Sequence, residues 1–175
     1  KFSDNTMHLY RYILENEPSL KIYWLTKNIR LFKELRKKNL PVLYYLSVQG
    51  IYYSLKAGVV IVSSGKQDVN ELMINGAKII NTWHGAPMKK IGLSEQNSKS
   101  LKANIIKRFL PFIWEYNVSY VVSAGKPFNH IMAKAFNLFK EQVLLTGYPR
   151  NDVFFHPFLS QTHPLIEEIR SNFDN

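Results

Sequence analysis

Six short runs of β-branched, aromatic and other apolar residues recur along the chain, and each is followed by turn residues. They span residues 20–26, 40–46, 57–64, 77–83, 118–124 and 141–147. Between them lie segments with apolar residues on one side and Lys, Glu or Asn on the other, at 29–39, 49–56, 68–74 and 126–139. Apolar runs that alternate with helical segments are typical of a parallel sheet covered by helices on both faces. We therefore predict an open α/β fold.

Four of the predicted strands end in small or polar residues. The endings are 63–65 (Ser-Ser-Gly), 84–85 (His-Gly), 123–125 (Ser-Ala-Gly) and 146–149 (Thr-Gly-Tyr-Pro). In a parallel sheet these ends share one edge, where open α/β folds bind ligands and where helix N-termini favour anions. We therefore expect a ligand site at this edge.

The length of 175 residues and the apolar content of 46% suit one ordinary domain. Because the chain has no cysteine, disulfides, thiolate zinc sites and cysteine nucleophiles are excluded. No stretch approaches the ~20 apolar residues that span a bilayer and no signal peptide opens the chain, so we expect a protein that is soluble or rests on a membrane surface. Residues 163–175 read as a helix that stops where another strand could begin, so we also expect a fragment.

The 23 Lys and Arg residues outnumber the 13 acidic residues, and the net charge of +10 makes polyanions the expected partners. Nucleic acid, anionic lipid, nucleotides and phosphate-bearing polymers all fit this charge. However, no helix-turn-helix, RRM or OB signature is legible, and most aromatic residues fall in apolar runs that favour core packing. A nucleic-acid-binding module is therefore a weak alternative, and we expect no nucleic acid partner.

The segment 89–108 is unusually basic, with six Lys or Arg residues and one Glu. It runs into a stretch, 98–116, in which apolar residues at helical spacing are flanked by cations. This stretch could lie on anionic lipid, or it could form a helix that packs on its own sheet, and the pattern leaves both open. The predicted membrane-surface residues are Lys102, Lys107, Arg108, Phe109 and Trp114.

His84 is the candidate catalytic base, because it follows a predicted strand and stands next to Gly85, which leaves space for a substrate. Its ordinary pKa of about 6.5 suits proton transfer at neutral pH. The alternative is a structural histidine bonded to a loop carbonyl. Pro87 can begin a helix whose N–H groups face an anion, and Lys89 and Lys90 add positive charge, although they also fit a solvated face.

A second polar cluster, Thr-Gly-Tyr-Pro-Arg-Asn-Asp at 146–152, follows the last predicted strand. Arg150 could clamp a phosphate, while Asn151 or Asp152 could cap the following helix. Equally, the cluster could be an interdomain hinge held by an Arg150–Asp152 ion pair. His130 fits packing or a surface position better than ligand binding. No metal-binding, Walker or dinucleotide signature is present, so we predict no metal in this chain.

Residues 82–92 (TWHGAPMKKIG) and 146–152 (TGYPRND) together resemble the CDP-glycerol glycerophosphotransferase family, which includes teichoic-acid enzymes and relatives in capsule synthesis. The segments 1–5 (KFSDN) and 23–28 (YWLTKN) are also similar to that family. The resemblance implies a GT-B architecture of two Rossmann-like halves. Residues 1–150 would be the Rossmann-like acceptor half, and 151–175 a linker and helix toward a donor half that the chain lacks.

For the site, the resemblance implies that His84 is the general base. It would take a proton from an acceptor hydroxyl, which attacks a CDP-linked polyol donor, with no further cofactor. The acceptor would be a phosphate-rich or glycan polymer, in some members lipid-linked, and the enzyme would be cytoplasmic and peripheral on the inner face of the membrane. The implied substrate-binding residues are Trp83, Gly85, Lys89, Lys90, Ser123, Arg150 and Asp152.

The chain departs from the family pattern at Ala86, where Thr is common, and at Met88, where Leu is common. The first departure puts in doubt any hydrogen bond made by that hydroxyl. Two other functions remain open. One is a sugar-nucleotide glycosyltransferase on the same two-half scaffold, and the other is a noncatalytic basic module that binds nucleic acid or anionic lipid.

Overall fold

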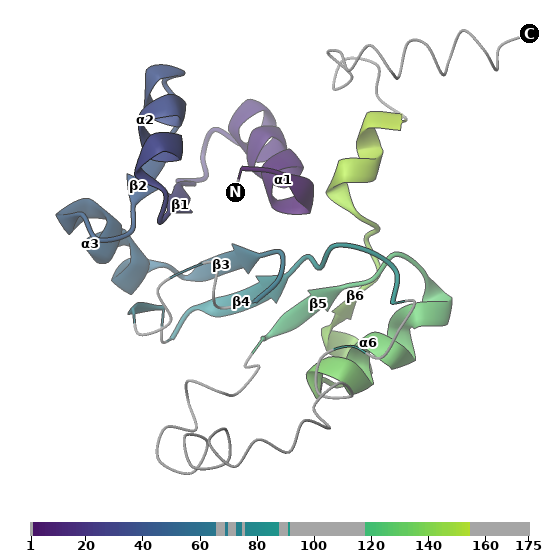
Figure 1. Ribbon diagram of the computed structural model, residues 1–175. Coiled ribbons are helices and arrows are strands. Elements are labelled where there is room, and N and C mark those ends of the chain that lie inside the picture. Colours follow the sequence, from purple (N-terminus) through teal and green to yellow (C-terminus); the bar gives the residue numbers. More distant parts are fainter. Residues whose placement is uncertain are drawn as a thin grey trace, which may run out of the picture.

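A computed structural model of the chain describes residues 2–65, 69, 73–74, 76–87, 91 and 118–154 (Figure 1). A two-stranded sheet pairs β1 (Trp24–Thr26) with β2 (Val42–Tyr44). A four-stranded sheet has the order β3 (Val59–Val62), β4 (Lys78–Asn81), β5 (Tyr120–Val122) and β6 (Val143–Leu144). All of these pairings are parallel, and each strand lies within a predicted run. The predicted parallel α/β fold is confirmed.

The register of the four-stranded sheet brings its strand ends to one edge. Val62 pairs with Asn81, which pairs with Val121, and Val122 pairs with Leu144. The residues that follow these strands are the four predicted small or polar endings. The strand ends therefore share one edge of the sheet, as predicted, and ligand binding at this edge stays a prediction.

The described helices mostly follow the predicted spacing. They are α1 (Asp4–Asn16), α2 (Ile29–Lys37), α3 (Val48–Lys56) and α6 (Asn129–Phe136), with short 3-10 turns η4 (Lys126–Phe128), η5 (Lys140–Gln142) and η6 (Pro149–Phe154). Side chains of Asn28 and Ser47 cap α2 and α3. Helix α6 ends before the predicted Phe139, because Asn137 adopts a left-handed conformation with φ of 54°. Most of the segment predicted at 68–74 lies outside the described residues.

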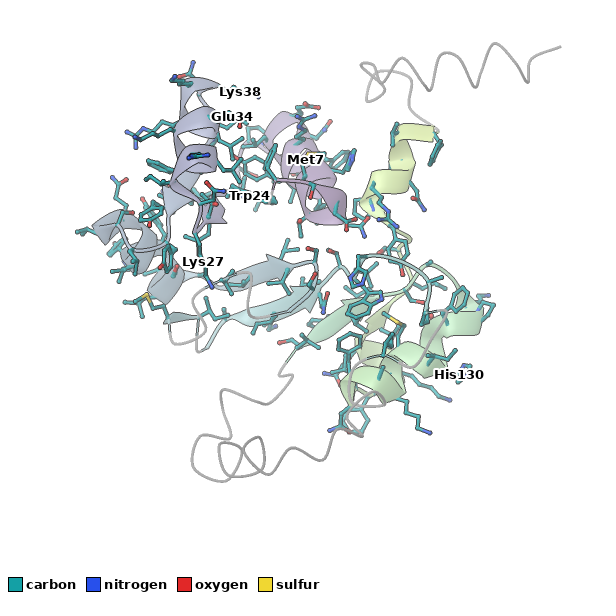
Figure 2. All side chains as sticks on the ribbon, in the orientation of Figure 1. Met7, Trp24, Lys27, Glu34, Lys38 and His130 are labelled. Carbon is teal, nitrogen blue, oxygen red and sulfur yellow. The ribbon has the colours of Figure 1, made fainter. Side chains whose placement is uncertain are left out.

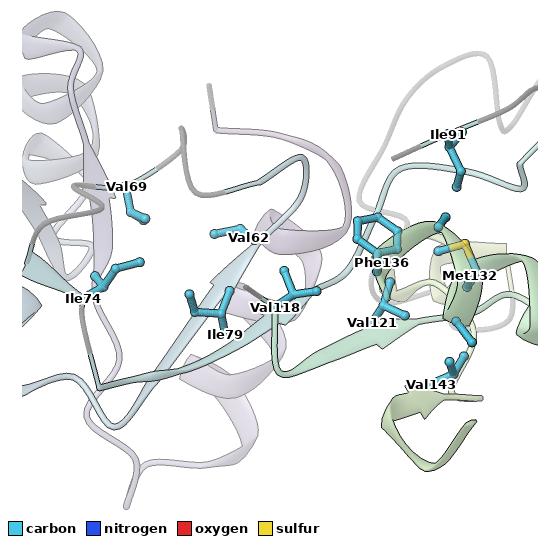
Figure 3. Close-up of a cluster of buried hydrophobic side chains, with 12 residues drawn as sticks. Val62, Val69, Ile74, Ile79, Ile91, Val118, Val121, Met132, Phe136 and Val143 are labelled. Atoms are coloured by element: carbon cyan, nitrogen blue, oxygen red, sulfur yellow. The ribbon is translucent and has the colours of Figure 1, made fainter. Parts of the chain in front are cut away.

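The main core runs along the four-stranded sheet, from Ile74 and Val62 at one side to Met132 and Phe136 of α6 at the other (Figure 3). Met132 and Phe136 of α6 are fully buried against Val121 of β5 and Val143 of β6. Burying a side chain of the size of Phe136 stabilises a fold by about 1.5–3 kcal/mol. Trp83, which follows β4, packs on the same cluster, so the core reaches the predicted ligand edge.

Helix α1 connects the two sheets. At the two-stranded sheet, Trp24 of β1, labelled in Figure 2, meets the rings of Phe2 and Tyr10 edge to face, at centroid distances of 4.7 and 5.6 Å. The Tyr10 hydroxyl also donates to the Pro41 carbonyl at 2.8 Å. At the four-stranded sheet, Asn5 contacts the residues that follow β4. No helix in the described part of the chain has the length and apolar character needed to cross a bilayer.

Candidate functional site

His84 stands just beyond β4 with an exposed side chain. Its Nδ1 lies 3.4 Å from the Ser63 carbonyl oxygen, beyond the end of β3. Because a carbonyl only accepts hydrogen bonds, this long contact favours the tautomer that carries the proton on Nδ1. Nε2 then holds a lone pair, as a general base requires.

The backbone at Trp83 is left-handed. The φ angle of Trp83 is 52°, which costs a bulky residue about 1–2 kcal/mol. The Asn81 side chain supports this turn by accepting the Trp83 N–H at 2.8 Å. The Trp83 ring packs edge to face on Phe136 at 5.2 Å, and the His84 ring lies against it at a centroid distance of 4.1 Å. The turn therefore anchors Trp83 on the core and leaves His84 at the surface.

The carbonyl groups of the loop after β4 are held by side chains from distant segments. Asn5 Nδ2 donates to the carbonyls of Trp83 at 2.7 Å and Thr82 at 3.5 Å. Arg150 Nη2 donates to the His84 carbonyl at 2.9 Å. The next carbonyl, that of Gly85, accepts the Tyr148 hydroxyl at 2.8 Å. The backbone that carries His84 is therefore fixed on both sides.

Arg150 is itself held by the start of α1. Its Nη1 pairs with Asp4 Oδ1 at 2.9 Å, and its backbone N–H donates to Asn5 Oδ1 at 3.2 Å. The predicted alternative of an Arg150–Asp152 pair is wrong, because the long-range partner Asp4 takes the guanidinium instead. Asp152 lies exposed on η6.

The structure brings together four of the predicted site residues: Trp83, His84, Gly85 and Arg150. A Cβ added at Gly85 would meet only Arg150 Nη2, at 3.9 Å, which agrees with the predicted open space beside the histidine. Ser123 is fully buried, and its hydroxyl donates to the Gly125 carbonyl at 3.1 Å. This hydrogen bond lies in the turn that follows β5. A contact between Ser123 and a substrate stays a prediction.

Several predicted residues cannot be placed. Lys89, Lys90, Lys102, Lys107, Arg108, Phe109 and Trp114 lie outside the described residues. Their roles stay predictions. Within the described ranges, no group of three or more His, Asp or Glu side chains could hold a metal ion. His130 is exposed on α6, as expected.

Sequence reasoning missed the contribution of α1 to this site. Asp4 and Asn5 bond to Arg150 and to the loop of His84, and His8 on the same helix lies near enough to Arg150 and Asp152 to sense their charges. Burial, assisted by Arg11, lowers the pKa of His8, while Asp4 and Asp152 oppose the shift. The only available signal was the similarity of residues 1–5 to a family motif.

An exposed imidazole at the carboxyl edge of a parallel sheet, on a loop held by two distant segments, is the arrangement of an α/β ligand-binding domain with a candidate base. The family model of CDP-glycerol:poly(glycerophosphate) glycerophosphotransferase matches residues 1–173. The chain belongs to this family.

Named relatives agree with this assignment. The chain is 26% identical to a teichoic acid poly(glycerol phosphate) polymerase of Bacillus subtilis, over 95% of this chain and 22% of the relative. It is 28% identical to a teichoic acid glycerol-phosphate transferase of Staphylococcus aureus, over 89% of this chain and 40% of the relative. The chain therefore spans less than half the length of these relatives.

Solved structures with the same fold support the described topology. The wall teichoic acid polymerase TagF aligns with a TM-score of 0.65 at 22% identity, over 98% of this chain and 41% of that chain. A variant of TagF soaked with CDPG aligns with a TM-score of 0.67 at 20% identity, over 99% and 42%. These likenesses confirm the α/β fold of the chain.

Proposed function

We propose that this chain is the acceptor-binding half of a transferase that moves glycerol phosphate, or a similar polyol phosphate, from a CDP-activated donor to a hydroxyl of a cell-envelope polymer. The observation that carries the proposal is the exposed His84 ring on a braced loop at the ligand edge, in a chain that belongs to this family. The named relatives are a polymerase and a transferase of teichoic acid glycerol phosphate.

His84 acts in this proposal through Nε2, because Nδ1 faces the Ser63 carbonyl. Nε2 accepts the proton of the acceptor hydroxyl as that oxygen forms a bond to the glycerol-bearing phosphorus of the donor. The bond from this phosphorus to the oxygen of the cytidine monophosphate group breaks, and CMP leaves with the electron pair. Placement of the reactants and neutralisation of charge supply most of the remaining catalysis.

The substrate surface would surround this ring. The space beside Gly85 admits an acceptor hydroxyl, and the Trp83 ring packs against one side of the His84 imidazole. Arg150 uses both terminal nitrogens within the protein, so its primary task is to hold the loop, although a guanidinium retains further donors for a phosphate. Lys89, Lys90 and Asp152 are the other proposed contacts.

The donor half would lie outside this chain. The GT-B division into residues 1–150 and a linker 151–175 stays part of the proposal, and the chain covers 41% of TagF, which leaves room for a second half in the complete enzyme. CDP recognition would then reside in the other half, as would the choice of polyol. Teichoic acid and capsule polymers are both proposed acceptors.

We place this enzyme in the cytoplasm, peripheral on the inner face of the membrane, where it meets a lipid-linked acceptor. The support is the net charge of +10 and the basic segment 89–108. Sedimentation with vesicles that contain anionic lipid tests this part. If a variant that lacks residues 98–116 binds the vesicles as well as the full chain, the prediction that this stretch contacts the membrane is refuted.

The test of the proposed function is a donor comparison with the complete enzyme that carries this chain. CDP-glycerol, CDP-ribitol and a UDP-sugar are offered with a teichoic-acid acceptor, and CMP or UDP release is measured together with acceptor extension. We expect CMP release and extension with a CDP-polyol. Transfer from the UDP-sugar alone would contradict the proposal and indicate a glycosyltransferase.

A further inference from the structure

Asn5 is a fully buried polar side chain that joins three parts of the chain. Its Nδ2 donates to the Trp83 carbonyl at 2.7 Å, and its Oδ1 accepts the Arg150 N–H at 3.2 Å. These groups lie 78 and 145 positions away in the sequence. A carboxamide carries an uncharged donor and an uncharged acceptor on separate atoms, and both ends of the Asn5 carboxamide are used here.

These bonds act on the two peptide planes that flank His84. The carbonyl of Trp83 belongs to the plane before the His84 Cα, and the carbonyl of His84 belongs to the plane after it. Because peptide units are planar, fixing both planes fixes φ and ψ of His84 and thus the direction of its Cβ. Asn5 holds the first plane directly, and Arg150 holds the second.

Asn5 also contributes to the second plane through Arg150. Its Oδ1 holds the backbone of Arg150, while its neighbour Asp4 holds the guanidinium at 2.9 Å. The start of α1 therefore sets where Arg150 Nη2 reaches the His84 carbonyl. The hydrogen bonds that hold the two peptide planes around His84 therefore both depend on the first residues of α1, Asp4 and Asn5.

We propose that Asn5 is a positioning residue for His84, an inference that rests on the proposed role of His84 as general base. Attachment of α1 alone does not explain the carboxamide. Phe2, Tyr10 and Trp24 already attach this helix to the two-stranded sheet through ring contacts and the Tyr10 hydroxyl. A buried amide costs free energy unless its partners are present, and here those partners are the backbone around His84.

The test is Asn5→Asp in the complete enzyme, compared with Tyr10→Phe as the matched control. Asn5→Asp keeps the side-chain size and an acceptor for Arg150, but it removes the donor to the Trp83 carbonyl. Tyr10→Phe removes a buried bond to a backbone carbonyl from the same helix, yet that bond goes to Pro41. Each variant removes one hydrogen-bond donor from α1, and only the donor of Asn5 reaches the loop that carries His84.

We expect Asn5→Asp to lower kcat by about 10- to 100-fold, since small displacements of a reacting group have effects of this size. The KM for the CDP-linked donor should change by less than about threefold, because the proposed donor site lies on the other half. Tyr10→Phe should keep kcat within about twofold. If folded Asn5→Asp has a kcat less than about fivefold below that of Tyr10→Phe, the inference is overturned.

Two further variants keep the test decisive. If Asn5→Asp does not fold, Asn5→Ala replaces it, because it removes the same donor without placing a charge in the buried site. The same loss of kcat is expected, and a kcat within about threefold of wild type would overturn the inference. His84→Gln, run in parallel, separates the two proposals: full activity in that variant refutes the general base, whereas an inactive His84→Gln with an active Asn5→Asp refutes only the role of Asn5.

Discussion

The hydroxyl of Tyr148 donates a 2.8 Å hydrogen bond to the carbonyl of Gly85, 63 positions earlier in the chain. This bond joins the segment after β6 to the loop after β4, next to the exposed ring of His84. Tyr148 is almost fully buried, and burial raises the pKa of its hydroxyl, with Arg150 opposing the shift. The hydroxyl therefore stays protonated and remains a donor at neutral pH.

Tyr148→Phe should lower the free energy of unfolding by about 1 kcal/mol, because the ring packing is kept and one buried hydrogen bond is lost. Urea denaturation of this chain measures the change. Tyr12→Phe is the control, since Tyr12 is about half exposed on α1. Equal stability of Tyr148→Phe and Tyr12→Phe would show that the bond to Gly85 contributes nothing.

Gly50→Ala should destabilise the chain by about 1–3 kcal/mol, as overpacking in a close contact does. A Cβ at Gly50 would collide with the Tyr44 carbonyl oxygen and lie 3.1 Å from the Ser47 hydroxyl oxygen. Gly58→Ala is the matched control, because a Cβ there meets no atom within 4 Å. Thermal unfolding should separate the two variants, and a similar melting temperature for both would refute the close approach of α3 to β2.

The stability of the fold should decline at alkaline pH through Tyr10. Burial raises the pKa of Tyr10 from 10.0 to about 12. The unfolded chain therefore loses this proton first, so the contribution is complete below pH 10 and is lost as the pH rises from 10 to about 12. The urea midpoint, measured at steps across this window, should fall more steeply for wild type than for Tyr10→Phe. Parallel curves would contradict the assignment.

The strands were predictable because each is a short apolar run, and strands that are buried on both faces of a parallel sheet have this composition. Helix α1 was not, for a physical reason. Its two fully buried residues, Asn5 and Tyr10, bond to distant carbonyls, whereas the apolar Met7, Ile13 and Leu14 of the same helix are only partly buried. Hydrophobic spacing alone does not reveal that a polar residue such as Asn5 is the most deeply buried position of a helix.

The candidate site was predictable only in part. His84 stood out because a polar residue after a strand marks the ligand edge of the sheet. The pairing of Arg150 could not be read from the sequence, since the nearby Asp152 was an equally good partner and the true one, Asp4, lies 146 positions away. The left-handed Trp83 also left no pattern, because Trp rarely adopts that conformation.

The most direct test of the account is the turnover of His84→Gln in the complete enzyme with a CDP-polyol donor and a polymer acceptor. Gln keeps a polar side chain of similar reach but cannot accept the proton. We predict that kcat falls by about 10²- to 10⁴-fold, the usual contribution of a general base, while donor binding is retained. Turnover close to that of wild type would contradict the account.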